Sequence, residues 1–139
     1  MRRLAPSLLV ALALLAACGG TDDGAADAGG PTALEIALWP AGEGQGTAVL
    51  ATLTCDPAGG DLPDPAAACA ALAAEADALE PVGPDIACTE IYGGPEQARI
   101  TGTLAGARVD ASLGRGNGCE IDRWERLRPL LPAYEPVPL

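Results

Sequence analysis

The sequence of 139 residues predicts an α+β domain, with an antiparallel sheet and helices on one face. Alternating apolar residues mark several strands, two further segments have apolar residues at helical spacing, and no strand–helix–strand repeat is present. Aromatic residues make up only 3% of the chain, so the core must consist of Leu, Val, Ile and Ala. A small aliphatic core leaves a thin stability margin, which favours covalent cross-links.

Two strands are predicted in the first part of the domain. Alternating apolar residues indicate one strand over 33–39, ended by Pro40, and a second over 47–54, with a Gly-rich turn between them. The segment 56–63 is expected to be a loop. The residues expected to face the core are Leu34, Ile36, Leu38, Val49, Ala51 and Leu53.

A helix is predicted to begin after Asp64, a typical N-cap residue, with Pro65 at the first helical position. Two prolines just beyond residue 80 end it. Cys69 lies on its apolar face and therefore points at the core, where Cys55 could meet it. The apolar face follows helical spacing through Cys69, Leu72, Ala73, Ala76 and Leu79.

A hairpin over 98–113 is the clearest element, with its turn at Ala105-Gly106 and apolar residues alternating with polar ones. A short helix follows and is ended by Pro129. Residues 132–139 are expected to form a loose tail. The residues expected to face the core are Ala98, Ile100, Leu104, Val109, Ala111 and Leu113 in the hairpin, and Ile121, Trp124 and Leu127 in the helix.

The N-terminus has the layout of a secretory signal. Basic residues precede an apolar run over 7–17, which is too short for a comfortable membrane span of roughly 20 residues. The run ends in Leu15-Ala16-Ala17-Cys18, which resembles the bacterial lipobox, where the cysteine sulfur carries a diacylglycerol. The alternative is an ordinary signal peptide that happens to precede a cysteine.

These features predict the organisation and the location of the chain. Residues 1–17 are expected to be a lipoprotein signal peptide, and residues 18–31, rich in Gly, Ala and Asp, a flexible tether. The protein is expected to be exported and then either anchored to the outer face of the cell membrane through lipid on Cys18 or secreted. Removing Cys18 from the count leaves Cys55, Cys69, Cys88 and Cys119.

Four cysteines in an exported chain indicate disulfides. A zinc site with four cysteine ligands is the alternative, but the chain has no C-x-x-C pair and the expected compartment is oxidising. We therefore expect no metal site.

The composition excludes many enzyme classes. The chain has no His, its 8 basic residues are all Arg, and its 19 acidic residues give a formal net charge of −11. Without His there is no Ser–His–Asp or Cys–His pair, and without Lys there is no P-loop or Schiff-base lysine. Because so few cations could neutralise a run of phosphates, nucleic acid is not expected as a partner. No cofactor is expected either.

One group of carboxylates could suggest a hydrolase. Glu120, Asp122 and Glu125 lie close together in the last predicted helix. Asp122 and Glu125, however, stand at helical spacing from Arg126 and Arg128, which indicates surface ion pairs. We therefore expect that the protein is not an enzyme.

Four motifs in the sequence match the pattern of a known protein family. They are Leu53-Thr54-Cys55-Asp56-Pro57-Ala58-Gly59-Gly60, Pro65-Ala66-Ala67-Ala68-Cys69-Ala70-Ala71-Leu72, Cys88-Thr89-Glu90-Ile91-Tyr92 and Asn117-Gly118-Cys119-Glu120. With the residues between them, they resemble the signature of the subtilisin inhibitor-like proteins of actinobacteria, over about residues 33–126. The resemblance implies a domain over 32–131 with a five-stranded antiparallel sheet, two helices on one face, and the disulfides Cys55–Cys69 and Cys88–Cys119.

The resemblance also implies a function. Members of this family inhibit serine proteases by presenting a reactive loop that the enzyme binds as it binds a substrate. In this sequence, the loop would consist of Cys88 at P3, Thr89 at P2, Glu90 at P1, Ile91 at P1′ and Tyr92 at P2′. The expected partner is therefore a serine protease.

This sequence departs from the family at four places, one of which is Thr89, where the family has Pro at P2. Glu90 stands where active members typically have Met, Lys or Arg, and a carboxylate cannot enter an apolar pocket without a large desolvation cost. A glutamyl-specific protease is therefore the natural target, and the alternative is a surface lipoprotein that does not inhibit and uses the scaffold for binding or envelope structure. Gly93-Gly94 is expected to loosen the loop. The aromatic C-terminus of the family is missing, which leaves little support for a homodimer.

Overall fold

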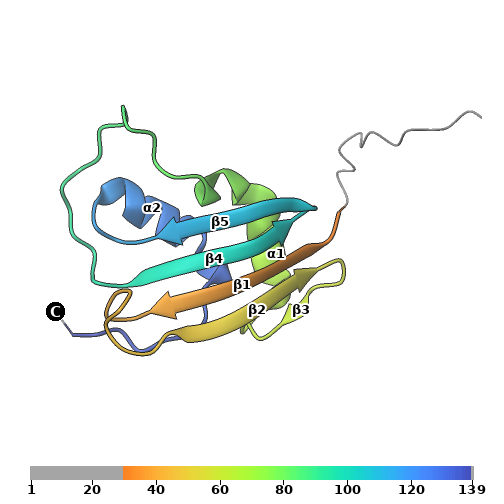
Figure 1. Ribbon diagram of the computed structural model, residues 1–139. Coiled ribbons are helices and arrows are strands. Elements are labelled where there is room, and N and C mark those ends of the chain that lie inside the picture. The colour runs from red at the N-terminus through yellow and green to blue at the C-terminus, as the bar shows by residue number, and fades with distance from the viewer. Residues whose placement is uncertain (1–29, 139) are drawn as a thin grey trace, which may run out of the picture.

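The computed structural model of the protein describes residues 30–138. The predicted signal segment, Cys18 and nearly all of the predicted tether lie outside these residues. The described part contains a five-stranded sheet in the order β3-β2-β1-β4-β5, in which every neighbouring pair of strands is antiparallel (Figure 1). The strands are β1 (Thr32–Trp39), β2 (Val49–Cys55), β3 (Gly59–Gly60), β4 (Gln97–Leu104) and β5 (Ala107–Leu113).

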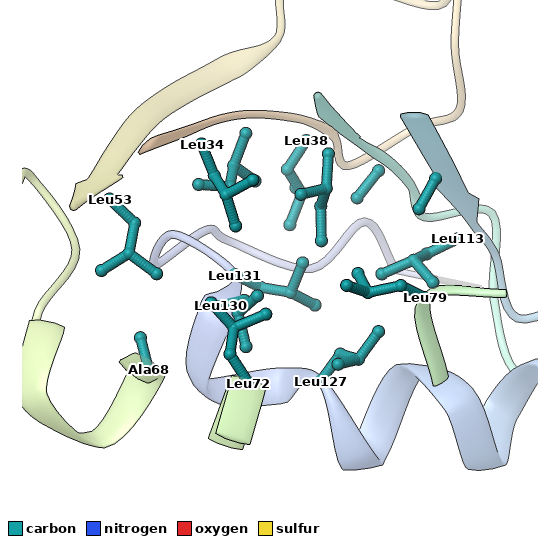
Figure 2. Packing of buried hydrophobic residues seen from close by; sticks show 14 of the residues in the cluster. Leu34, Leu38, Leu53, Ala68, Leu72, Leu79, Leu113, Leu127, Leu130 and Leu131 are labelled. Atoms are coloured by element: carbon teal, nitrogen blue, oxygen red, sulfur yellow. The ribbon is translucent and has the colours of Figure 1, made fainter. Parts of the chain in front are cut away.

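Two α-helices and two single 3-10 turns cover one face of the sheet (Figures 1 and 2). They are α1 (Pro65–Glu75), η1 (Ala76–Leu79), α2 (Gly118–Arg126) and η2 (Arg128–Leu130). The predicted fold class is therefore confirmed, with its five strands, two helices and two disulfides. Among the residues that the structure describes, no helix is long and apolar enough to cross a membrane.

The strands form where alternating apolar residues predict them. In the β4–β5 hairpin, Ile100 pairs with Ala111, and both side chains are buried. The short strand β3 lies in the segment that we expected to be a loop. Gly60 adopts φ +115°, and a Cβ there would overlap the backbone of Thr52, so only glycine lets this strand approach β2 so closely.

Helix α1 begins as predicted, because the Asp64 carboxylate accepts a hydrogen bond from the backbone N–H of Ala67 at 3.0 Å. Its buried face is narrower than predicted. Ala73 and Ala76, which we expected to face the core, are exposed. The α-helix ends at Glu75 and a 3-10 turn follows, so helical spacing no longer applies beyond that point, and the alanine-rich sequence fits several faces equally well.

The core lies between the sheet and the helical layer (Figure 2). Leu34 and Leu38 point from the sheet toward the helices, and Leu130 and Leu131 lie between the two layers. Trp124 is the largest side chain that is fully buried among the described residues. The other residues with no exposed surface are Leu38, Leu53, Ala68, Ile100, Leu127 and Leu130.

The start of the C-terminal tail packs against this core, whereas we expected the whole tail to be loose. Tyr134 lies edge-on to Trp124, with 6.4 Å between the ring centroids, and Pro132 is buried. Burial raises the pKa of the Tyr134 phenol, and the negative charge of Glu96 adds to this effect. Val137, near the end of the described residues, is exposed.

Replacing Trp124 with Ala should lower the free energy of unfolding by about 3–5 kcal/mol, because the change leaves a large cavity under the sheet. Urea denaturation followed by circular dichroism would measure this loss. Trp39→Ala is the matched control, since Trp39 is half-buried at the end of β1 and should lose clearly less. Equal losses in the two variants would contradict the central role of Trp124.

Candidate reactive loop

The long irregular segment between η1 and β4, residues 80–96, carries the predicted functional residues. Figure 1 shows that it leaves η1, passes around α2 and returns to the start of β4. We refer to Cys88–Tyr92 within it as the candidate loop. Cys88 is half-buried, whereas Ile91 and Tyr92 are 59% and 61% exposed. Large apolar side chains this exposed are available to a partner.

One end of the candidate loop is held by a covalent bond and a hydrogen bond. Cys88 forms a disulfide with Cys119, as predicted, and the backbone N–H of Gly118 donates a hydrogen bond to the carbonyl oxygen of Thr89 at 2.9 Å. A Cβ at Gly118 would overlap the Thr89 hydroxyl. Glycine therefore lets α2 begin directly against the loop.

The other end is held by a backbone hydrogen bond. The N–H of Gly93 donates a hydrogen bond to the carbonyl oxygen of Arg115 at 2.7 Å. A Cβ at Gly93 would lie 2.9 Å from Ile121, and Gly94 is buried with φ +141°. The two glycines thus permit close packing beside the loop, which differs from our expectation that they loosen it.

The residues between these two ends are free to meet a partner. Within the described part of the chain, the Glu90 carboxylate makes no hydrogen bond and no ion pair. A hollow of about 520 Å³ lies beside Thr89, between the segment 80–89 and α2, and another of about 360 Å³ lies beside Tyr92. The side chains of the candidate loop from Glu90 to Tyr92 are therefore accessible to a partner.

A buried ion pair supports the end of the loop that has no disulfide. Nη1 of Arg115 lies 3.0 Å from Oε1 of Glu96, and Glu96 is only 3% exposed. The second carboxylate oxygen and the Arg115 Nε are buried without a hydrogen-bond partner. Sequence reasoning missed this pair, because the two residues are 19 positions apart and both lie outside any periodic pattern.

A second set of ion pairs holds the helices together beneath the loop. Arg126 of α2 donates hydrogen bonds to Glu75 at 2.5 Å and to Asp77 at 2.7 Å. The hydrogen bond from Arg126 lowers the pKa of Asp77 below its usual value. Arg123, which we did not single out, is buried and donates to the carbonyl oxygens of η1, Ala78 at 3.0 Å and Leu79 at 3.3 Å.

The predicted surface ion pairs of α2 are confirmed. Asp122 lies 3.9 Å from Arg126, and Glu125 lies 2.6 Å from Arg128. The hydrogen bond from Arg128 lowers the pKa of Glu125. Glu120 pairs with Arg123 at 2.8 Å. In the part of the chain that the structure describes, no group of three His, Cys, Asp or Glu residues could hold a metal ion.

The second predicted disulfide is also present and lies away from the candidate loop. Cys55 at the end of β2 is bonded to Cys69 of α1, with 5.9 Å between the Cα atoms. The bond ties the sheet to the helical layer. The Cys55–Cys69 bond therefore cross-links the body of the domain, whereas the Cys88–Cys119 bond holds the candidate loop.

The arrangement offers an exposed peptide, fixed at both ends, on a small domain with two disulfides. A fixed extended peptide loses little conformational entropy when a partner binds it, which favours tight association. These properties define a class of protein, the small disulfide-bonded domains that present a held surface loop to a partner. The chain belongs to the subtilisin inhibitor-like family, whose sequence model matches residues 30–117, more than half of the chain. This membership identifies it as an inhibitor and not an enzyme.

A solved structure gives a further comparison. The chain is similar to Streptomyces caespitosus sermetstatin, crystallised in complex with Bacillus licheniformis subtilisin, at 29% sequence identity. The match covers 73% of this chain and 97% of that chain, with a TM-score of 0.49. No curated protein sequence matches the chain.

Removing the Cys88–Cys119 disulfide should have a local effect on the candidate loop, whereas removing the Cys55–Cys69 disulfide should not. Cys88→Ser/Cys119→Ser and Cys55→Ser/Cys69→Ser should each cost about 3–4 kcal/mol of stability, since the bonds close loops of 31 and 14 residues. Only the first pair should expose the candidate loop to rapid proteolysis between Thr89 and Tyr92. Limited proteolysis with mass spectrometry measures this, and similar cleavage of both variants in this segment would contradict it.

Proposed function

We propose that the protein is an inhibitor of serine endopeptidases, with Glu90–Ile91 as the bond presented to the active site. One observation carries the proposal: the exposed residues Glu90 to Tyr92 lie between two held ends in a member of an inhibitor family. A protease binds such a peptide as it binds a substrate, through backbone hydrogen bonds and a pocket for the P1 side chain.

The inhibitor needs no catalytic group of its own. The protease serine attacks the carbonyl carbon of Glu90, an acyl-enzyme forms, and the amine of Ile91 becomes the leaving group. Because the chain is held at Cys88 on one side and at Gly93 on the other, the amine remains close to the acyl carbon. It can then re-form the peptide bond faster than water hydrolyses the ester. Inhibition follows from this competition.

The side chain of Glu90 determines which proteases can be inhibited. Its carboxylate makes no ion pair within the described residues, so it would enter the S1 pocket as an unpaired charge. An apolar S1 pocket cannot accept that charge without a large desolvation cost, whereas a pocket with a cation can. We therefore propose a glutamyl-specific serine protease as the target.

The purified protein should inhibit a glutamyl endopeptidase stoichiometrically, with slow cleavage at Glu90–Ile91. Glu90→Gln should weaken binding by about 2–5 kcal/mol, because the pocket cation would lose its partner. Glu35→Gln is the matched control, since Glu35 is exposed on the open face of the sheet. Active-site titration and mass spectrometry of the complex measure both effects.

Substitutions of the P1 residue, Glu90, distinguish a domain with an unusual target protease from a domain that no longer inhibits any protease. If the loop is preformed, Glu90→Met should inhibit subtilisin-like enzymes and Glu90→Lys trypsin-like enzymes. Rapid cleavage of the native protein by every protease tested, together with inactivity of both variants, would contradict the proposal. That result would favour the alternative, a surface lipoprotein that uses the scaffold as a binding or envelope module.

We also propose that lipid on Cys18 anchors the protein to the outer face of the membrane. The geometry of the domain suits such an anchor. The chain enters β1 beside the β4–β5 turn, where the Gly106 N–H donates to the Pro31 carbonyl at 3.0 Å. The far end of β1 pairs with Gln97, which follows the segment 80–96. The point where the chain enters the domain and the candidate loop thus lie toward opposite ends of β1, whose 8 residues span about 26 Å (Figure 1).

Cys18→Ser should release the protein from the membrane fraction of its expression host. The lost thiol would carry no diacylglycerol, and without it the acidic domain is repelled by anionic lipid. Detergent phase partition and the mass of the N-terminal peptide are the measurements, and Thr21→Ser, which keeps the cysteine, is the control. A native protein without lipid on Cys18 would contradict the anchor and leave secretion as the location.

A further inference from the structure

The two ends of the candidate loop are not held equally. The Thr89 side has the Cys88–Cys119 disulfide and a hydrogen bond from Gly118. The Tyr92 side has a single hydrogen bond, from the Gly93 N–H to the Arg115 carbonyl oxygen at 2.7 Å. The position of the Ile91 nitrogen therefore depends on where Arg115 lies.

Arg115 holds this side of the loop twice. Its backbone carbonyl accepts the hydrogen bond from Gly93, and its guanidinium pairs at 3.0 Å with Glu96, directly before β4. Gly94 lies against the pair, because a Cβ there would overlap Glu96 Oε2 and lie 3.1 Å from Arg115 Nη1. The backbone of Arg115 thus fixes one end of the stretch 93–96, at Gly93, and its side chain fixes the other end, at Glu96.

The ion pair between Glu96 and Arg115 is better suited to fix the position of the chain beside the loop than to stabilise the fold. The Glu96 carboxylate is almost fully buried, yet only one of its oxygens has a hydrogen-bond partner. A buried pair with incomplete hydrogen bonding contributes little stability compared with apolar side chains of the same size, but it is directional. Removal of Arg115 leaves the Glu96 charge buried and unpaired, and the stretch 93–96 is then expected to move so that the carboxylate reaches water.

We infer that Arg115 is a positioning residue for the primed side of the reactive loop, acting through its ion pair with Glu96. The consequence for inhibition rests on the proposed function. With the pair intact, the Ile91 amine released by cleavage stays beside the acyl carbon of Glu90 and re-forms the bond. Without the pair, the amine moves away and water completes the hydrolysis, so the inhibitor becomes a substrate.

The first test needs no protease. In Arg115→Met, the amide hydrogen of Gly93 should exchange about tenfold faster than in the native protein, while the amides of Gly118 and of Ile100 in β4 change little. Arg115→Lys should largely restore the native rate, because a single hydrogen bond to Glu96 suffices. The matched control is Arg99→Met, which removes an exposed ion pair with Asp110 on the sheet.

Two results would overturn the inference. One is an unchanged exchange rate at Gly93 in Arg115→Met, and the other is equal acceleration at Gly93, Gly118 and Ile100, which would indicate general destabilisation. If Arg115→Met does not fold, Glu96→Met gives the same comparison, since it removes the hydrogen-bond acceptor and the charge from the other side of the pair. Faster exchange confined to Gly93 is again the supporting result.

The second test uses the inhibited protease. With a glutamyl endopeptidase, Arg115→Met should be hydrolysed at Glu90–Ile91 about tenfold or more faster than the native protein, with a similar association rate. Unchanged hydrolysis would contradict the inference. If the native protein engages no protease, the proposed function fails in that measurement alone, and the exchange experiment still decides the role of Arg115.

Discussion

A peptide that must stay extended and exposed cannot be held by packing, so its shape depends on contacts at its two ends. In this protein, one short segment, residues 115–119, supplies those contacts and runs from the loop after β5 into the first turn of α2. Arg115, Gly118 and Cys119 hold the candidate loop by hydrogen bonds and a disulfide. The segment in turn is placed by α2, whose first turn is capped by Asn117. The candidate loop therefore depends on the start of α2 and on the segment that leads into it.

The chain has few aromatic residues, and its helical layer is held against the sheet by leucine packing and by arginine contacts. Trp124 is fully buried and Tyr134 packs edge-on against it. Leucines fill much of the space between the sheet and the helices (Figure 2). Arg123 and Arg126 then connect α2 to η1 and α1 through carbonyl and carboxylate oxygens. Because α2 also orients the loop, these contacts under the sheet contribute to the geometry of the functional surface.

Sequence reasoning predicted what depends on local pattern. Alternation located the four longer strands but not β3, and Asp64 with Pro65 located the start of α1. The disulfides and the candidate loop came from the family resemblance. Other features depend on contacts between distant segments and leave no periodic signal. The pairing of Glu96 with Arg115 is one of them. The exposed faces of Ala73 and Ala76 are another case, since a run of alanines carries almost no information about orientation.

The position of the Cys88–Cys119 bond also affects what a cut in the loop can release. The bond closes a covalent ring that contains Glu90–Ile91 and the whole of β4 and β5. Cleavage of one peptide bond in the ring opens the ring but releases no fragment. The mass of the protein then increases only by that of one water molecule. A peptide can leave only after a second cut within the same ring, much of which is backbone hydrogen-bonded in the sheet and closed to a protease active site. Release of a peptide that contains β4 and β5 would therefore require the sheet to open first.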